Sequence, residues 1–539
     1  MRTTATFSLR PQGARRWLSL AICAWLLWGV PTLVTGQTAT VSDLPQLGDG
    51  GDLSAAQESR IGERIVRDLY RDPSYLEDPV LMDYVQSIWQ PLLAAARQRG
   101  ELTTELDERF AWRVMLLRES SVNAFALPGG YLGLHLGLLA IVSSRDELAS
   151  VLGHELSHVT QRHIARMMSK SSRQAPWMMA AMILGILAVS KNPDAGNALV
   201  VGGQALGVQS QLNFSRDMER EADRVGFGVV TQAGYQAQGF VGMFDKLQQA
   251  SRLNDTGAYP YLRTHPLSTE RLADMQARIP MTTGPKAAVL VNLGDALMSV
   301  RAKVLISPDA STLQTWQAIL DEPAAAKPVS QQLLEHYAAA LAALQTRDVR
   351  VARQYVLRMQ GVLERASGAQ PPVIDSRVAQ YITWLSAEVD LAARDLSPAQ
   401  LSRLDATLTK AFSGGAQRRP VMLLRSQLSL QLGTTEALRR AAQDLQAWLR
   451  IDPADATVWQ SLSDLHAALK LNLRSLRDAA EAQVAQHNLG AALDRLRAAQ
   501  DLARKLGVSA SPAEQIEASI IDTRFRQVAA LVKAQALER

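Results

Sequence analysis

The segment His154-Glu155-Leu156-Ser157-His158 constrains this chain more than any other feature. Ser144 and Glu147 form the pattern of a helix N-terminus just upstream, so a helix is expected over about 145–168. Residues four apart lie on one face of a helix, so both imidazoles can bind one metal ion through neutral ring nitrogens. Glu155 is offset by about 100°, which directs its carboxylate to a water on the metal rather than to the metal itself. The pattern predicts a zinc-dependent hydrolase site, and a surface helix with incidental histidines is the weaker alternative.

Cysteine usage restricts the remaining ligands. The single cysteine, Cys23, lies in an N-terminal segment that we expect to be removed, so the mature chain has no thiolate for zinc, disulfides or nucleophilic catalysis. A third ligand must then be a histidine or a carboxylate. A helix expected from residue 216 to about 230 supplies Glu219 and Asp223, four residues apart. Glu219 can therefore coordinate a zinc ion, one per chain, while Asp223 either accepts a hydrogen bond from a ligand histidine or faces the substrate.

The N-terminus resembles a secretory signal peptide. Arg2, Arg10, Arg15 and Arg16 precede an uncharged stretch over 17–36 that ends in small residues. Residues 1–36 are therefore predicted to direct export and to be cleaved, with an uncleaved membrane anchor as the alternative. The four arginines supply most of the net charge of +5, which leaves +1 for the rest of the chain. Nucleic-acid binding gains no electrostatic support from so small a charge.

Composition and periodicity predict a mainly α-helical protein. Aromatic residues make up only 5% of the chain, and apolar residues recur at helical spacing over 58–70 and 79–97. Short apolar runs at 111–117 and 131–136, separated by a Gly-Gly turn, predict a small β-sheet. Two prolines and a glycine in 279–286 suggest a boundary between a zinc protease domain, residues 37–283, and an all-helical domain, residues 284–539.

The expected C-terminal domain carries a weak repeat signal. Residues 449–469 resemble a tetratricopeptide junction, in which a proline ends one helix and Trp459 and Leu462 mark the next. The spacing to later segments is not a regular 34 residues. A tetratricopeptide-like solenoid is therefore favoured over an irregular helical bundle.

Three motifs together resemble those of a known family. They are the His-Glu-x-x-His segment, Asn-Ala-Phe-Ala-x-Pro-Gly-Gly at 123–130, and Ser-Arg-x-x-Glu-x-x-Ala-Asp at 215–223. The set is similar to that of the zinc metallopeptidases that include the CAAX-prenyl protease and the HtpX membrane protease. The match covers about residues 105–275, and the signal peptide and helical tail make the chain most similar to periplasmic members of the family.

The resemblance implies a gluzincin-type protease domain with assigned roles. His154, His158 and Glu219 would be the zinc ligands, Glu155 the general base and Asp223 an active-site acid. The chain departs from the membrane members at 175–210, because the uncharged stretch 175–189 would span only about 22 Å as a helix. That region is expected to fold over the active site or to touch a membrane or partner peripherally, with an ordinary buried helix as the alternative.

The resemblance also implies a cellular role. The chain would be a periplasmic zinc endopeptidase with a chaperone-like function in outer-membrane protein assembly and quality control. Unfolded or misassembled outer-membrane proteins would be its substrates, and the repeat domain would contact the barrel-assembly machinery. An extended substrate could pair with a sheet edge at 131–136 or 111–117. A non-proteolytic chaperone or scaffold of the same fold, or a membrane-attached protease, are the alternatives.

Other histidines were considered as ligands. Pro266 favours an extended conformation for His265, just ahead of a helix that Ser268 or Thr269 can cap. We hypothesise that His265 is a candidate fourth zinc ligand that silences a resting state; an oxyanion-stabilising role and a surface or capping role are the alternatives. His163 lies five residues after His158, off the ligand face, and is expected to be an ordinary surface residue. No ligand spacing is found for His135, His336, His466 and His487.

Overall fold

The computed structural model describes residues 53–170, 216–253, 260–279, 292–307, 309–318, 327–367, 376–412 and 419–537. The predicted signal peptide, the segment 175–210 and the boundary segment after residue 279 lie outside the described residues. The described chain is mostly helical with one small mixed sheet, as the composition predicts.

The sheet has the strand order β1-β2-β4-β3, with β1 (Tyr75–Leu76), β2 (Arg113–Leu117), β3 (Ala124–Leu127) and β4 (Tyr131–His135). Strands β2 and β4 are parallel, whereas β1 is antiparallel to β2 and β3 is antiparallel to β4. A substrate-binding edge at 131–136 was therefore a wrong expectation, because β4 is paired on both sides. Strand β2 is covered by β1 only over its last two residues, and β3 forms an edge of the sheet among the described residues.

The turn between β3 and β4 needs glycine at both central positions. Gly129 and Gly130 have φ values of +77° and +80°, which side chains rarely adopt. A Cβ at Gly129 would lie 2.9 Å from the Cα of Ser59, and one at Gly130 would lie 2.9 Å from the Cβ of Phe110. The motif at 123–130 thus forms strand β3 and the hairpin turn that follows it.

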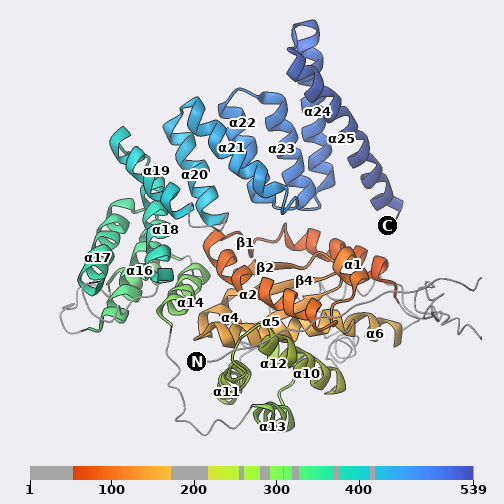
Figure 1. Ribbon diagram of the computed structural model, residues 1–539, viewed down its shortest axis with the longest axis vertical. Helices are drawn as coiled ribbons and strands as arrows, with labels where there is room; N and C mark the ends of the chain where they lie inside the picture. Colours follow the sequence, from red (N-terminus) through yellow and green to blue (C-terminus); the bar gives the residue numbers. More distant parts are fainter. Residues whose placement is uncertain are drawn as a thin grey trace, which may run out of the picture. The chain divides into compact units, whose positions relative to one another are not determined.

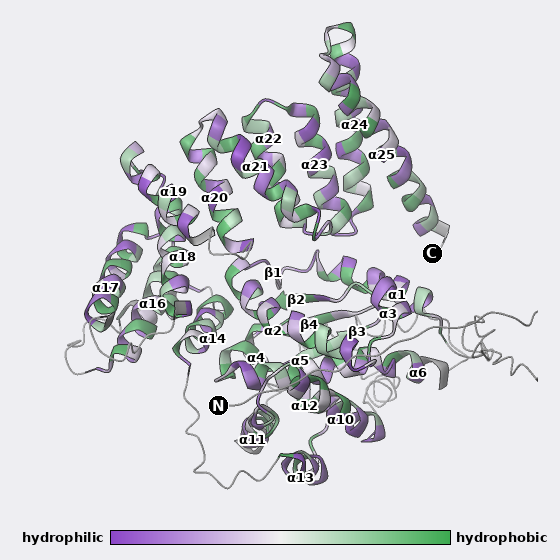
Figure 2. Ribbon diagram, viewed as in Figure 1, coloured by the Kyte–Doolittle hydropathy of each residue, from purple (hydrophilic) through white to green (hydrophobic). Residues whose placement is uncertain are grey.

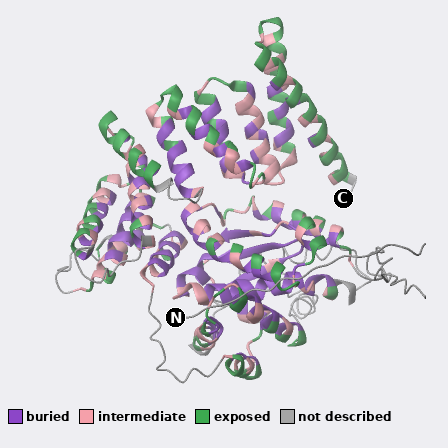
Figure 3. Ribbon diagram, in the orientation of Figure 1, coloured by how far each residue is buried: buried purple, intermediate pink, exposed green. Residues whose placement is uncertain are grey.

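The helices of the first part are α1 (Ala55–Leu69), α2 (Pro79–Gln98), α3 (Thr104–Arg109), α4 (Leu136–Ile141), α5 (Arg145–Thr160), α6 (His163–Lys170), α10 (Arg216–Gln232), α11 (Gln238–Leu253), α12 (Pro260–Thr264) and α13 (Thr269–Arg278). The two faces of the sheet are both buried (Figure 3). Met115 and Leu117 pack in a cluster with α1 residues such as Ile65, whereas Val114 and Leu116 belong to the larger core that includes α2 and α5. Side chains alternate between these layers because successive strand residues point to opposite faces.

The helix that carries His-Glu-x-x-His ends earlier than expected. Helix α5 begins after Ser144, whose hydroxyl accepts a hydrogen bond from the Glu147 amide, but it stops at Thr160 instead of continuing to about residue 168. Arg162 has φ +52° and interrupts the helix between α5 and α6. Its guanidinium contacts the buried carboxylate of Glu58 on α1 at 3.1 Å, which holds this left-handed residue in place.

The helices of the second part are α14 (Leu293–Ile306), α15 (Ala310–Ala318), α16 (Val329–Gln345), α17 (Val349–Ser367), α18 (Ser376–Ala393), α19 (Pro398–Phe412), α20 (Arg419–Leu432), α21 (Thr435–Leu449), α22 (Ala456–Ala468), α23 (Asn472–Ala485), α24 (Leu489–Leu506) and α25 (Pro512–Leu537), with a 3-10 turn at Gly507–Ser509. Successive helices from α20 to α25 pack side by side in chain order (Figure 1). Each carries both hydrophilic and hydrophobic residues (Figure 2), as expected for helices that bury one face.

The helices beyond residue 292 share a core with the first part. Helix α14 packs on α4, and the main apolar cluster contains residues from α2, α5, α14, α16 and α18. Arg301 of α14 forms ion pairs at 2.8 Å with Asp78, the N-cap of α2, and with Glu388 of α18. Arg419 of α20 contacts Glu77 at 2.6 Å. Among the described residues, none of the helices is long and apolar enough to cross a membrane.

Candidate metal centre

Helices α5 and α10 bring the predicted ligands together because they pack closely at glycines. A Cβ at Gly226 would lie 3.0 Å from the carbonyl oxygen of Gly153 and 3.1 Å from the amide nitrogen of His154. This contact places Glu219 of α10 opposite the two histidines of α5. All of these side chains are buried.

Four side chains converge on one point. His154 Nε2 lies 3.0 Å from His158 Nε2, and the two oxygens of Glu219 lie 3.5 Å from these two nitrogens respectively. His265 Nδ1 lies 3.1 Å from Glu219 Oε1 and 3.4 Å from His154 Nε2. One donor atom from each of the four residues lies within 4.8 Å of the others.

These separations fit a zinc ion. Ligand atoms at the usual 2.0–2.1 Å from a tetrahedral zinc are about 3.3 Å apart, and the printed contacts between donor atoms here run from 3.0 to 3.5 Å. Three nitrogens and one carboxylate oxygen are also ligand types that zinc accepts. The sequence-predicted set of His154, His158 and Glu219 is therefore assembled, and His265 joins it.

Asp223 contacts a ligand histidine instead of facing outward. Its Oδ1 lies 2.9 Å from His154 Nδ1, and Arg271 donates two hydrogen bonds to its carboxylate at 2.6 and 2.8 Å. Arg271 also lies 2.9 Å from Glu219 and donates a hydrogen bond at 2.8 Å to the Pro266 carbonyl. Of the two roles considered for Asp223, this geometry favours orienting His154.

The same contacts set the charge of His154 and Glu219. Burial alone would lower the pKa of His154, but hydrogen bonds with Asp223 and Glu219 raise this pKa to about 9. Burial would raise the pKa of Glu219, but the charges of and hydrogen bonds from His265 and His154 hold this pKa well below its ordinary value. Glu219 is therefore ionised and available as a ligand.

Glu155 differs from the other carboxylates of the site. It is fully buried, and burial raises its pKa above the ordinary value while the charges of His265 and His154 act in the opposite direction. Its Oε1 lies 3.5 Å from His265 Nε2. A carboxylate with a raised pKa beside the ligand cluster is suited to accept a proton.

His163 is buried, so the expectation of a surface residue was wrong. The helix is interrupted at Arg162, and the Nδ1 atoms of His163 and His158 lie 2.8 Å apart. Its Nε2 lies 3.1 Å from Glu221 Oε2. Burial lowers the pKa of His163 to about 4. The expectation assumed one continuous helix through residue 168, in which a residue five positions on would point elsewhere.

Sequence reasoning also missed Arg271 and Tyr261. Tyr261 is buried, and its ring centroid lies 4.7 Å from that of His265. Neither residue lies in the three family motifs at 123–130, 154–158 and 215–223. The one available signal was position, because Tyr261 and Arg271 flank His265 at the start of a capped helix.

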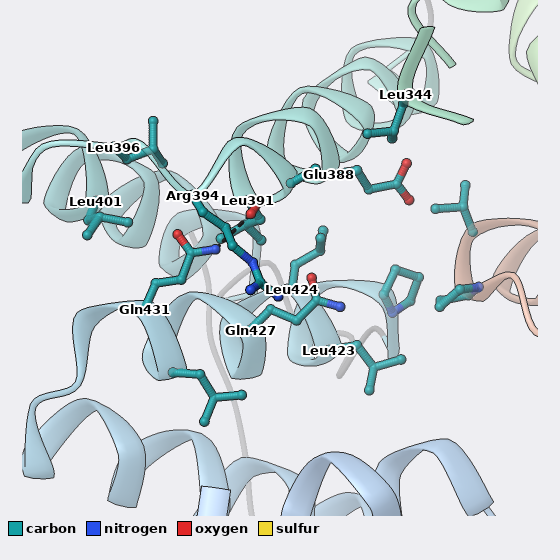
Figure 4. A pocket seen from close by; sticks show the side chains of 15 residues that line it. Leu344, Glu388, Leu391, Arg394, Leu396, Leu401, Leu423, Leu424, Gln427 and Gln431 are labelled. Carbon is teal, nitrogen blue, oxygen red and sulfur yellow. Dashed lines mark hydrogen bonds between the residues drawn. The ribbon is translucent and has the colours of Figure 1, made fainter. Parts of the chain in front are cut away.

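Another pocket lies away from this cluster. It has a volume of about 870 Å³ and lies among α18, α19 and α20, with leucines such as Leu391, Leu401 and Leu424 in its walls (Figure 4). Its lining includes no histidine, and its carboxylate, Glu388, is paired with Arg301. This pocket therefore offers no site for the hydrolytic chemistry.

The fold and the buried cluster define a class of protein. A His-Glu-x-x-His helix, a glutamate from a second helix and a glutamate free to act on water are the components of a zinc-dependent peptidase centre.

Comparison with known proteins places this centre in a family. Residues 83–279 match the model of peptidase family M48. The chain is 28% identical over 478 residues to the beta-barrel assembly-enhancing protease of Escherichia coli K12, which covers 87% of this chain and 90% of the relative. Residues 83–279 therefore belong to peptidase family M48, and this part of the chain is a zinc metalloendopeptidase domain.

Two further relatives show how far the similarity extends. The chain is 35% identical over 238 residues to the putative beta-barrel assembly-enhancing protease of Vibrio cholerae, and it spans about half (47%) of that relative. It is 32% identical over 195 residues to the mitochondrial metalloendopeptidase OMA1 of Arabidopsis thaliana, which is 36% of either chain. The resemblance to this group of zinc metallopeptidases is confirmed.

Proposed function

We propose that this chain is a periplasmic zinc endopeptidase that acts in outer-membrane protein assembly and quality control. In this proposal His154, His158 and Glu219 hold the zinc ion, Glu155 is the general base, and Asp223 orients His154. The observation that carries it is the convergence of the four donor atoms beside a buried Glu155. A bound zinc ion would polarise the scissile carbonyl and lower the pKa of water to about 7.

The residues of the chain perform the remaining steps. Glu155 accepts a proton from the attacking water and passes it to the leaving amine. Asp223 accepts the Nδ1 proton of His154 and so keeps its Nε2 free for the metal. Strand β3, an edge of the described sheet, offers backbone groups on which an extended substrate could pair.

We further propose that His265 keeps the described state inactive. A catalytic zinc site has three protein ligands and an open fourth position, whereas four protein donor atoms converge here. His265 follows the short helix α12, and Arg271 holds the next residue through the Pro266 carbonyl. Withdrawal of His265 would open a position for water and substrate.

Replacement of His265 separates the three roles considered for it. His265→Ala should raise basal cleavage or self-cleavage if His265 blocks the fourth position, and it should lower cleavage if His265 stabilises the oxyanion. Unchanged kinetics together with unchanged zinc coordination would leave only a capping or surface role.

The cellular role rests on the relatives. The Escherichia coli relative is named for enhancing β-barrel assembly, and the alignment covers 90% of its length. Misassembled barrel proteins would supply extended segments that suit a strand edge. Export through cleavage of residues 1–36 would place the chain in the periplasm.

We assign residues 37–283 to the protease domain and residues 284–539 to a tetratricopeptide-like domain that contacts substrates and the barrel-assembly machinery. The side-by-side packing from α20 to α25 supports a repeat-like array. Deletion of helices α21 to α25, whose apolar side chains cluster apart from the main core, should leave peptidase activity on a short peptide but impair the cellular role. A protein that lacks α21 to α25 and is unfolded by circular dichroism would contradict the separation of these helices from the protease core.

The substrate class can be tested in cells. Envelope proteins are compared by mass spectrometry between strains that carry the wild-type chain and Glu155→Gln. Outer-membrane barrel proteins should accumulate in the Glu155→Gln strain. Equal levels of every barrel protein under assembly stress would contradict the quality-control role and favour the non-proteolytic chaperone.

A further inference from the structure

The two ring nitrogens of His158 face different partners. Its Nε2 faces the ligand cluster, 3.0 Å from His154 Nε2, while its Nδ1 lies 2.8 Å from the Nδ1 of His163. Both rings are fully buried. The Nδ1 of His158 therefore faces a second imidazole, where His154 has the carboxylate of Asp223.

When Nε2 of His158 binds a metal, only one placement of the ring protons on His158 and His163 fits these contacts. A coordinating nitrogen carries no proton, so neutral His158 carries its proton on Nδ1 and donates it to His163. His163 must then accept at Nδ1 and carry its own proton on Nε2. That nitrogen lies 3.1 Å from Glu221 Oε2, which accepts the proton.

The backbone holds this chain of hydrogen bonds in place. Arg162 adopts φ +52° between α5 and α6, which brings the His163 ring back beside the last turn of α5. Glu221 comes from α10, between Glu219 and Asp223, and Arg166 of α6 donates a hydrogen bond to the same carboxylate at 2.6 Å. Helix α10 thus supplies Glu219 to the cluster itself, and it supplies Asp223 and Glu221 to the histidines around it.

We propose that His163 and Glu221 are positioning residues that fix the tautomer and direction of His158, an inference that rests on the proposed role of His158 as a zinc ligand. Asp223 and Arg271 orient His154 from one side, and Glu221 orients His158 from the other through His163. Without His163, the Nδ1 proton of His158 would lose its acceptor in a buried site, and the ring would be free to take the other tautomer.

Zinc affinity measures this role without reference to catalysis. The full chain is stripped of metal, and zinc is titrated against a chromophoric chelator of known affinity. His163→Leu should bind zinc about 10–100-fold more weakly than the wild type, while His163→Gln, which keeps one acceptor and one donor, should restore most of the loss. Arg166→Met is the matched control, because it removes a partner of Glu221 that does not touch His158, and its affinity should stay near the wild type.

Nuclear magnetic resonance gives a signature that a packing role would not produce. In the zinc-loaded wild type with ¹⁵N-labelled histidine, His158 should be protonated at Nδ1 and His163 at Nε2. A proton on Nδ1 of His163 would overturn the proposal. In His163→Gln the Nδ1 proton of His158 should remain protected from exchange with water.

The outcomes separate this inference from the proposed function. A wild-type chain that binds no zinc would reject the metal centre itself. If the wild type binds zinc and His163→Leu binds it equally tightly, the inference alone is rejected. The same holds if the metal-free His163→Leu protein melts at a lower temperature but its zinc affinity is unchanged. If His163→Leu does not fold, Glu221→Leu is tested in its place, because Glu221 is partly exposed. Unchanged zinc affinity in Glu221→Leu would contradict the proposal.

Discussion

Three carboxylates near the candidate centre have different surroundings, and these surroundings separate their roles. Glu219 and Asp223 each face a histidine and Arg271, and both have lowered pKa values despite burial. Glu155 is buried with weaker compensation, so its pKa is raised. The lowered pKa values favour the ionised forms of Glu219 and Asp223, whereas the raised pKa of Glu155 favours uptake of a proton.

Glu219→Ala should lose zinc, because it removes the only carboxylate among the four convergent donor atoms. Metal content after dialysis, measured by mass spectrometry, should fall well below one zinc per chain. Glu270→Ala, which removes an exposed acid on α13, should keep full occupancy. Full occupancy in Glu219→Ala would place the third ligand elsewhere.

Single residues with a local pattern were predictable, and those placed by distant contacts were not. His154, Glu155 and His158 follow from spacing on one helix, and Glu219 is assigned by the resemblance of residues 215–223 to the family motif. His163 was misplaced because nothing in the sequence marks the left-handed turn at Arg162, which depends on Glu58 more than 100 residues earlier. Arg271 was missed because its role arises only where α10 and α13 meet.

At the scale of elements, the packing of α5 on α10 sets the geometry of the centre. Gly226 lies against the backbone of Gly153 and His154, and that backbone cannot move aside as a flexible side chain can. Two glycines at one crossing allow the helices to approach closely, which brings Glu219 within reach of both histidines.

Gly226→Ala should weaken zinc binding, because its Cβ would lie 3.0–3.1 Å from backbone atoms and would push α10 away from α5. Gly228→Ala is the control on the same helix. Its Cβ would meet only the end of the Arg99 side chain, which can move. Chelator competition should show weaker binding in the first variant and wild-type affinity in the second; equal affinities would show that the spacing of the helices does not govern the site.

Elements with strong periodicity were predicted within a few residues, as α1, α2 and α10 show. Strands β2 and β4 followed from their apolar runs, but β3 is a four-residue strand rich in alanine and was not recognised. Strand order could not be read from the sequence, since an apolar run predicts burial and not its neighbours. Of the two candidate edges, β4 is paired on both sides, whereas β2 is covered by β1 only over its last two residues.

At the scale of the whole molecule, a buried charged cluster joins the two predicted domains. Arg301 lies between Asp78 and Glu388, and it also donates a hydrogen bond to Tyr337. These residues come from α14, α2, α18 and α16. The prolines and glycine at 279–286 suggest a boundary but do not predict these contacts, because the contacts join residues that lie far apart in the sequence.

Arg301→Met should destabilise the chain by about 3–5 kcal/mol, because it leaves buried carboxylates without their cation. Burial already raises the pKa of Glu388, and loss of Arg301 would raise it further. A raised folded-state pKa lowers stability as pH rises, so the deficit should be larger at pH 8 than at pH 5. Chemical denaturation at both pH values measures it. Arg353→Met, which breaks a more exposed pair with Asp395, should cost much less; equal effects of the two variants would contradict the role of the cluster.

We expect Glu155 to act on water beside a zinc ion that other residues hold. Zinc content and cleavage of an unfolded outer-membrane barrel protein should be measured in the same preparation of Glu155→Gln. We expect the wild-type amount of zinc, one ion per chain, and no cleavage, because the substitution removes the proton acceptor and leaves the ligands intact. A zinc-loaded Glu155→Gln protein that cleaves at the wild-type rate would contradict it.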